Sequence, residues 1–167
     1  NVPNLNFPGL EVHKLTAVRS TDETFSQLVH ADGHIFTAQD QEARRDTLLS
    51  LFETIQPDVL ITEAYPFGRR QMRFELVPLT TAAKTRANRP LIISSIRDIM
   101  QEDRKPSRVE ETLNAVAEFF DLVFVHGDPA LVRIEDSLQG AEQIMDKVRY
   151  TGLVAPTAPS SSAKHSS

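Results

Sequence analysis

The 167-residue sequence contains no cysteine, which excludes disulfide bonds and thiolate chemistry. Its apolar runs fall well short of the roughly 20 residues that a membrane-crossing helix needs, and it contains no Asn-x-Ser/Thr acceptor for N-glycosylation. The first residues also lack the basic and apolar regions of a signal peptide. These absences lead us to expect a cytoplasmic protein without a transmembrane segment.

Several common binding and catalytic motifs are absent as well. The sequence has no Gly-x-Gly-x-x-Gly and no Walker loop, which argues against the usual cradles for dinucleotides and nucleoside triphosphates. It has no Gly-x-Ser-x-Gly nucleophile elbow either. The histidines lack the spacing of metal ligands, and the segment Ala31–His34 (ADGH) favours a polar loop over a metal motif. We therefore expect neither a bound metal nor a cofactor.

The composition is that of a folded protein with a core. Hydrophobic residues make up 40% and charged residues 25%, which favours a folded chain over disorder. The net charge of −5 argues against a broad basic surface for nucleic acid, although it leaves room for a small basic pocket. Residues 155–167 are small, polar and rich in proline and serine, which predicts a disordered linker or tail. We accordingly place one α/β domain at residues 1–154.

Short apolar runs rich in β-branched residues predict the strands of this domain. Three of them lie at Asp58–Thr62, Pro90–Ser94 and Asp121–Val125, and we expect the first to be a central strand. Looser alternation at Leu10–Val18 predicts a strand near a sheet edge, and Val148–Val154 predicts a last strand.

Helical patterns separate these runs. Residues 41–55 predict an amphipathic helix that ends before Pro57, after a loop at 21–38 that has room for one helical turn. Its apolar face is formed by Leu48, Phe52 and Ile55. Residues 69–87 are ambiguous, because Met72, Phe74 and Leu76 fit the period of a strand, whereas Met72, Leu76 and Leu79 fit that of a helix. We favour a second helix, interrupted or restarted near Pro78.

Two more helices are predicted in the C-terminal half. One is expected to open with a capping box formed by Ser107 and Glu110. Its core-facing residues are Val109, Leu113, Val116 and Phe120. The other would be capped by Asp128, with Pro129 at its first position. Its apolar stripe consists of Leu138, Ala141, Ile144 or Met145, and Val148.

The alternation of strands and helices predicts the fold class. Apolar strands that alternate with amphipathic helices form parallel sheets with helices on both faces. Right-handed crossovers then give a doubly wound, mainly parallel, Rossmann-like α/β domain. In such a sheet, ligands bind beyond the carboxyl ends of the strands.

Polar residues follow each of the three apolar strands, and neighbouring strands would bring them to one rim of the sheet. The clusters are Glu63, Tyr65, Phe67, Gly68, Arg69 and Arg70; Ser95, Arg97 and Asp98; and His126, Gly127 and Asp128. Gly127 permits a turn where the chain leaves the sheet. Asp128 could contribute to an anion site at a helix N-terminus, or could simply cap that helix. His126 could act in a site or could hydrogen-bond only to the backbone.

The arginines of these clusters also have two interpretations. Arg69 and Arg70 could bind a carboxylate or phosphate through paired hydrogen bonds. Alternatively, Arg70 or Arg73 could pair with Glu75 or Glu63. Arg97 and Asp98 could contact a substrate, or could form an ion pair that fixes their loop.

The same clusters carry a resemblance to a known family. The segments that carry it are Pro57–Leu76, Arg89–Met100, Phe120–Val132 and Val148–Ala155. They resemble predicted bacterial glycosyltransferases that are similar to glycosyltransferase family 28, typified by the UDP-N-acetylglucosamine transferase of peptidoglycan synthesis. The resemblance covers most of residues 5–155, and the run EAYPFGRRQMRFE is its most specific part.

The resemblance implies the GT-B architecture, in which two Rossmann-like domains face a cleft. This chain would then be the N-terminal, acceptor-side domain, without the family's opening strand and Gly/His loop. The nucleotide-sugar donor would bind a C-terminal domain, and the sugar would pass to a hydroxyl-bearing acceptor without a metal. We expect this fragment alone to be inactive.

The resemblance also implies roles for matching residues. His126 or Glu63 would be the catalytic base, unless the Gly/His loop supplies it. The substrate-binding residues would be Arg69, Arg70, Arg97, Asp98 and Asp128. The alternative is a non-catalytic α/β module that binds a small ligand bearing phosphate or carboxylate.

Overall fold

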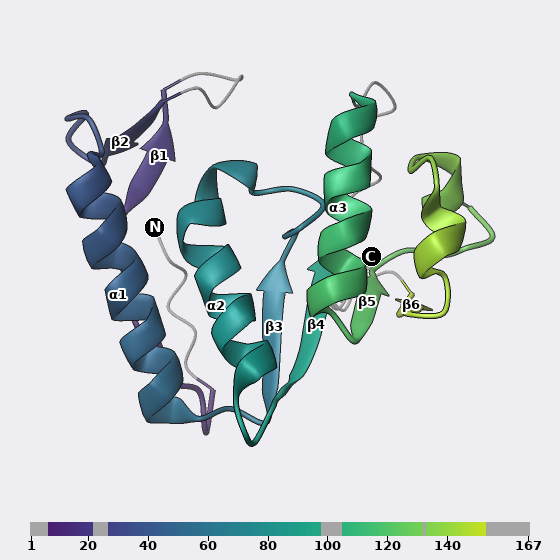
Figure 1. Cartoon of the computed structure of the whole chain (residues 1–167), viewed down its shortest axis with the longest axis horizontal. Coiled ribbons are helices and arrows are strands. Elements are labelled where there is room, and N and C mark those ends of the chain that lie inside the picture. Colours follow the sequence, from purple (N-terminus) through teal and green to yellow (C-terminus); the bar gives the residue numbers. More distant parts are fainter. Residues whose placement is uncertain (1–6, 22–26, 98–104, 132, 153–167) are drawn as a thin grey trace, which may run out of the picture. The chain divides into compact units, whose positions relative to one another are not determined.

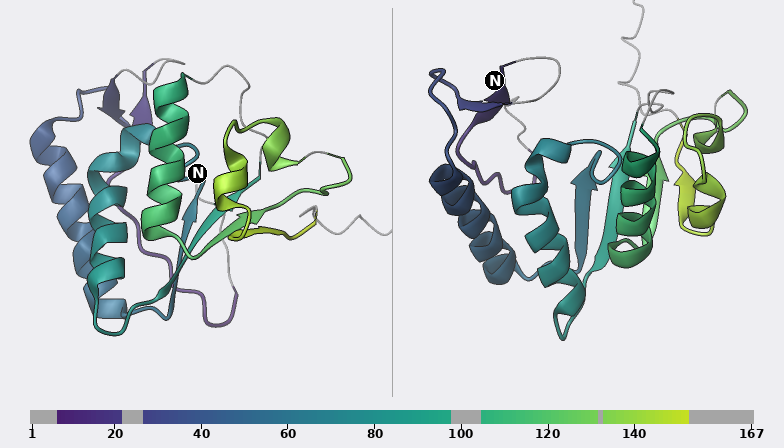
Figure 2. Two further views of the ribbon diagram at one scale, coloured as in Figure 1. Left: turned by 45° about the vertical axis from the view of Figure 1, so that its right-hand side comes forward. Right: turned by 45° about the horizontal axis from the view of Figure 1, so that its top comes forward.

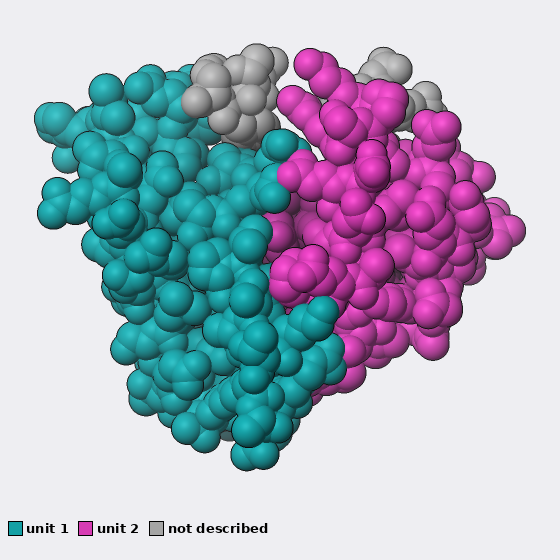
Figure 3. Space-filling view, in the orientation of Figure 1, with its two compact units in different colours: residues 1–58, 69–90 teal, residues 59–68, 91–167 magenta. Residues whose placement is uncertain are grey.

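The structure is a computed structural model that describes residues 7–21, 27–97, 105–131 and 133–152. The predicted tail at 155–167 lies outside these residues. The chain divides into two compact units, residues 1–58 with 69–90 and residues 59–68 with 91–167 (Figure 3). Each unit has its own set of secondary-structure elements.

The second unit contains a four-stranded parallel sheet (Figure 1). Its strands, in spatial order, are β3 (Val59–Glu63), β4 (Leu91–Ile96), β5 (Leu122–Val125) and β6 (Val148–Tyr150). All four expected strands of this half are therefore present, and the predicted α/β class with a parallel sheet is confirmed. The prediction of a central position for the first strand is wrong, because β3 lies at the edge of this sheet.

The two faces of the sheet differ in burial at its β3 edge, whereas Ile92 and Ile93 of β4, on opposite faces, are both buried. Alternate residues on one face, including Ile92, Ser94 and Val123, have no exposed surface. On the other face of the edge strand, the side chains of Val59 and Ile61 are 46% and 56% exposed. The buried face fixes the register, because a shift by one residue would turn its apolar side chains to the opposite side.

Helix α3 (Pro106–Phe119) runs alongside β4 and β5 (Figures 1 and 2). It buries Leu113 and Val116, and Phe120 just after its end is also buried, as the sequence predicts. The predicted capping box is wrong. The helix begins one residue before Ser107, with Pro106 in its first turn, where the missing amide of proline costs no hydrogen bond.

The carboxyl end of α3 is closed by a lysine from another segment. The Lys147 ammonium donates hydrogen bonds to the carbonyl oxygens of Val116, Ala117 and Phe120, at 3.1, 3.1 and 2.8 Å. The last carbonyls of a helix have no amide partner within the helix, and its dipole favours a positive charge there. Lys147 thereby ties the loop before β6 to α3.

The segment between β5 and β6 does not form the predicted helix. It contains two 3-10 turns, η2 (Ile134–Asp136) and η3 (Ala141–Ile144). The predicted apolar stripe is nevertheless buried, at Leu138, Ala141, Ile144 and Val148. Gly140 interrupts the helix with φ +80°, and a Cβ there would come within 2.9 Å of the Gln143 side chain and 3.0 Å of Leu113.

The first unit contains two helices and a small antiparallel sheet. Helix α1 spans Ala38–Ile55, and α2 spans Arg73–Thr85 after the 3-10 turn η1 (Arg70–Met72). Strands β1 (Val18–Ser20) and β2 (Leu28–His30) pair with each other. Of the strand predicted at 10–18, only Val18 belongs to a strand, because β1 begins there. The predicted loop at 21–38 contains β2.

Helix α1 begins with a capping box between Thr37 and Asp40, and it ends at Gln56, whose backbone is left-handed, just before Pro57. Phe52 is buried as predicted, whereas Ile55 is 54% exposed. Ile55 at the end of the helix therefore does not contribute its predicted apolar contact.

A buried ion pair connects the two helices of this unit. Arg44 of α1 binds Glu75 of α2 through two hydrogen bonds of 2.6 and 3.2 Å, and the Glu75 side chain is only 4% exposed. Arg44 also donates to the carbonyl of Thr16. Glu75 is thus paired with an arginine that the sequence did not suggest. Helix α2 runs through Pro78 without the predicted interruption.

We expect Lys147→Met to destabilise the fold by about 1 to 2 kcal/mol, because three helix-end carbonyls lose a charged donor. Urea unfolding followed by circular dichroism would measure the loss. Lys105→Met is the matched control at the amino end of α3, where a positive charge opposes the helix dipole. Equal unfolding midpoints for the two variants would contradict this role of Lys147.

Candidate functional site

The carboxyl ends of β3, β4 and β5 carry a rim of polar side chains within the second unit. The parallel register places Glu63 beside Ser95, and the next residue of β4, Ile96, beside Val125. His126 follows Val125, and its backbone amide donates to the carbonyl of Ile96. The three strand ends that the sequence selected therefore lie at one edge of the sheet.

His126 is held by hydroxyl groups at both ring nitrogens. Its Nε2 lies 2.8 Å from Ser95 Oγ, and its Nδ1 lies 2.6 Å from Thr151 Oγ1. His126 and Ser95 are half-buried, whereas Thr151 is exposed. His126 is thus not a histidine bonded only to the backbone: it is the middle member of a chain of side-chain hydrogen bonds, from β4 through the end of β5 to the end of β6.

Glu63 and Arg97 form the second pair of the rim. The Arg97 guanidinium lies 3.3 Å from a Glu63 carboxylate oxygen, and both side chains are more than 60% exposed. An exposed pair of this kind contributes little to stability. Both groups therefore remain accessible to a ligand, and Arg97 is a partner of Glu63 that the sequence did not suggest.

The loop that follows β3 is tightly held. Ala64 has a left-handed backbone with φ +64°, and its amide donates to the Ser95 carbonyl. The carbonyl of Tyr65 accepts hydrogen bonds from Thr62 and Ser94, at 2.9 and 2.7 Å. A residue with a Cβ pays roughly 1–2 kcal/mol for the left-handed region, and such strain often occurs at functional sites. These hydrogen bonds fix the loop to β4 next to Ser95.

Asp128 does not cap a helix. Its carboxylate accepts a hydrogen bond from the amide of Ala130 at 2.8 Å, and its carbonyl accepts one from Leu131 at 2.9 Å. Only a turn follows, so the predicted helix N-terminus, and with it the anion site that depends on a helix dipole, is absent from the described residues at this position.

Three of the predicted binding residues are not part of this rim as described. Arg69 and Arg70 belong to the first unit, where Arg69 has φ +56° and precedes η1. Both arginines are exposed. Asp98 lies outside the described residues. The roles of these three residues remain predictions.

Thr151 was not identified from the sequence. It stands directly after β6, so the rule that selected the residues after the other three strands would also have selected this one. Threonine at such a position is common, and only its contact with His126 distinguishes it.

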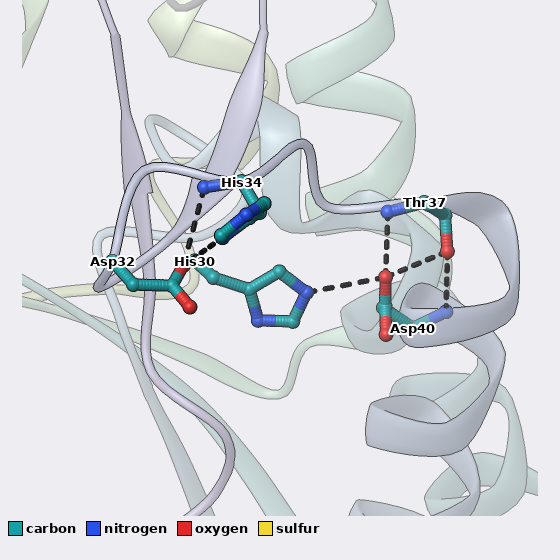
Figure 4. A network of polar contacts seen from close by, with 5 residues as sticks. All are labelled: His30, Asp32, His34, Thr37 and Asp40. Carbon is teal, nitrogen blue, oxygen red and sulfur yellow. Dashed lines mark hydrogen bonds and ion pairs between the residues drawn. The ribbon is translucent and has the colours of Figure 1, made fainter.

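The first unit holds a second polar cluster, at the corner between β2 and α1 (Figure 4). His30 points toward Asp40, with 3.2 Å between Nε2 and the carboxylate, while His34 and Asp32 contact each other across a turn at 3.1 Å. Asp40 also accepts hydrogen bonds from the Thr37 hydroxyl and amide, which with His30 lower its pKa to about 2.

This corner is structural. The amide of His34 donates to Asp32, and the His30 amide bonds to the His34 carbonyl, so the segment closes a tight turn with Gly33 at φ +94°. The predicted polar loop at Ala31–His34 is confirmed. Within the described residues, no group of three or more histidine and carboxylate side chains is placed to hold a metal ion.

Comparisons with protein-family models, with curated proteins and with solved structures found no match to this chain. Among the helices that the structure describes, none has the length and apolar character needed to cross a bilayer.

The low pKa of Asp40 predicts a specific acid sensitivity. A carboxyl whose pKa is lowered by folding stabilises the fold above its ordinary pKa of 3.8, and this contribution disappears as the pH falls toward about 2. We therefore expect Asp40→Asn to lower stability at pH 6, and its difference from the wild type to shrink as the pH is reduced to 2.

Urea unfolding at a series of pH values measures this difference. Glu42→Gln controls for the removal of one negative charge from α1. A difference between Asp40→Asn and wild type that stays constant from pH 6 to pH 2 would refute the assignment.

Proposed function

We propose that this chain is the acceptor-side domain of a GT-B glycosyltransferase, and that His126 is the base that accepts the proton of the acceptor hydroxyl. The observation that carries the proposal is the hydrogen-bonded chain from Ser95 through His126 to Thr151 at the carboxyl edge of the parallel sheet. This edge is where open α/β sheets bind their ligands.

The chemistry of the proposed reaction requires a base near an accessible surface. Transfer of a sugar from a nucleoside diphosphate replaces the diphosphate with the acceptor oxygen, which must lose its proton. His126 has an ionisable ring at the rim, with both nitrogens oriented by hydroxyls. Glu63 is the second candidate, but its carboxylate already has a cationic partner in Arg97, so we favour His126.

Charged residues near the base would act on the substrates. The guanidinium of Arg97 would contact a negative group on the acceptor or the departing diphosphate, since guanidinium groups bind carboxylate and phosphate through paired hydrogen bonds. Arg69, Arg70, Asp98 and Asp128 keep the substrate-binding roles that the family resemblance implies for them. The nucleotide-sugar itself would bind a second domain of the gene product.

The fold offers further support for the GT-B assignment. The outer edge of β3 is where the opening strand implied by the family resemblance would pair, because β3 has a partner strand on one side only among the described residues. Parallel sheets are normally buried on both faces, and apolar runs of this kind fit such burial.

A transfer assay on the complete product of the coding gene tests the proposal. It measures nucleotide release from a panel of nucleotide-sugars, with and without polyhydroxylated acceptors. We expect acceptor-dependent release, reduced on the order of 10²-fold or more in His126→Ala. Thr47→Ala, on the exposed side of α1, is the control that should retain full activity.

The fold of each variant is checked by circular dichroism. If no nucleotide-sugar is turned over or bound, the glycosyltransferase proposal fails. Binding of inorganic phosphate or small carboxylates by the same protein, weakened by Arg97→Ala, would then support the non-catalytic anion-binding module.

A further inference from the structure

We infer that Thr151 is a positioning residue that holds His126 in the tautomer with a proton on Nδ1, so that Nε2 accepts the hydrogen bond from Ser95. The effect of Thr151 on catalysis rests on the proposed function. The tautomer itself follows from the hydrogen-bond network of the second unit.

The count of protons and acceptors in this network distinguishes the two tautomers. The Thr151 hydroxyl has two backbone carbonyls within reach, those of Val125 at 3.5 Å and Gly152 at 3.4 Å. A hydroxyl carries one proton, and a carbonyl can only accept. When that proton points to a carbonyl, the oxygen of Thr151 is left to accept the hydrogen bond of 2.6 Å from His126 Nδ1–H.

The other end of the network gives the same assignment. With the proton on Nδ1, Nε2 has a lone pair, and the Ser95 hydroxyl donates to it across 2.8 Å. In the opposite tautomer Nε2–H would donate to Ser95, whose own proton would then have no acceptor among the hydrogen bonds of the described residues. Among the described residues, the Nδ1–H tautomer is therefore the one that gives every proton in the network a protein acceptor.

The direction of the hydrogen bonds defines the chemistry that the network supports. In the Nδ1–H tautomer all donors point the same way along the chain, from β4 toward β6. Ser95 donates to His126, His126 donates to Thr151, and Thr151 donates to a backbone carbonyl. A base must have a free lone pair on the side that faces its substrate. In this tautomer Nε2 carries the lone pair of the ring, which the Ser95 hydroxyl occupies. A substrate hydroxyl would therefore either displace the Ser95 hydroxyl from Nε2 or pass its proton to Nε2 through Ser95.

Thr151 therefore does for His126 what a buried carboxylate does for many catalytic histidines, which is to fix the tautomer and the ring orientation. It acts through His126 and touches no reacting atom. The serine variant of Thr151 keeps this hydroxyl, whereas valine has nearly the same shape without it.

Nitrogen-15 NMR of the imidazole in this chain tests the inference directly, because protonated and unprotonated ring nitrogens have well-separated shifts. At a pH where His126 is neutral, we expect the proton on Nδ1 in the wild type and in Thr151→Ser. In Thr151→Val we expect a shift toward a mixture of the two tautomers. His126→Gln identifies which signals belong to this histidine.

A wild-type spectrum with the proton on Nε2 would overturn the inference. So would an unchanged tautomer in a folded Thr151→Val protein. In the transfer assay of the complete gene product, we expect Thr151→Val to lower kcat at least about tenfold with little change in the acceptor KM, and Thr151→Ser to restore it. The NMR result decides the role of Thr151 even if no donor is turned over, which would count against the proposed function alone.

Discussion

The rim depends on the parallel register of the sheet in the second unit. Because β3, β4 and β5 run in the same direction, their carboxyl ends meet at one edge, and the register brings Ser95 within hydrogen-bond distance of His126. The fully buried side chains of Ile92 and Val123 fix this register. A slip of one residue would turn them, and Ser95 with them, to the opposite face of the sheet, and would move Ser95 away from the histidine.

The sequence predicted this part of the molecule well because its signals are local and strong. Short runs rich in β-branched residues favour strands, and their alternation with helices favours a parallel sheet. The rule that ligands bind at the carboxyl ends then selected Glu63, Arg97 and His126 without knowledge of any contact. The same rule could not show that Arg97 pairs with Glu63, since pairing depends on rotamers and on the exact course of two loops.

The predictions failed where a single residue or a distant contact overrides a periodic pattern. The apolar stripe before β6 is buried as expected, but Gly140 adopts a left-handed backbone and divides the segment into 3-10 turns. Without that helix, Asp128 caps only a turn. The partner of Glu75 proved to be Arg44, which is 31 residues away in the sequence and on another helix. Residue spacing predicts ion pairs only between neighbours on the same helix, so it could not identify this pair.

A hydroxyl and a carboxylate orient a histidine with different electrostatic consequences. A carboxylate beside Nδ1 stabilises the positively charged imidazolium as well as the tautomer, and so favours the protonated state both before and after proton transfer. The Thr151 hydroxyl carries no charge, so in the role inferred above it would orient the ring without placing a negative charge beside Nδ1. If the proposed sugar transfer is the reaction, the negative charge that develops on the leaving diphosphate would have to be stabilised by groups other than this histidine, which would only take up one proton.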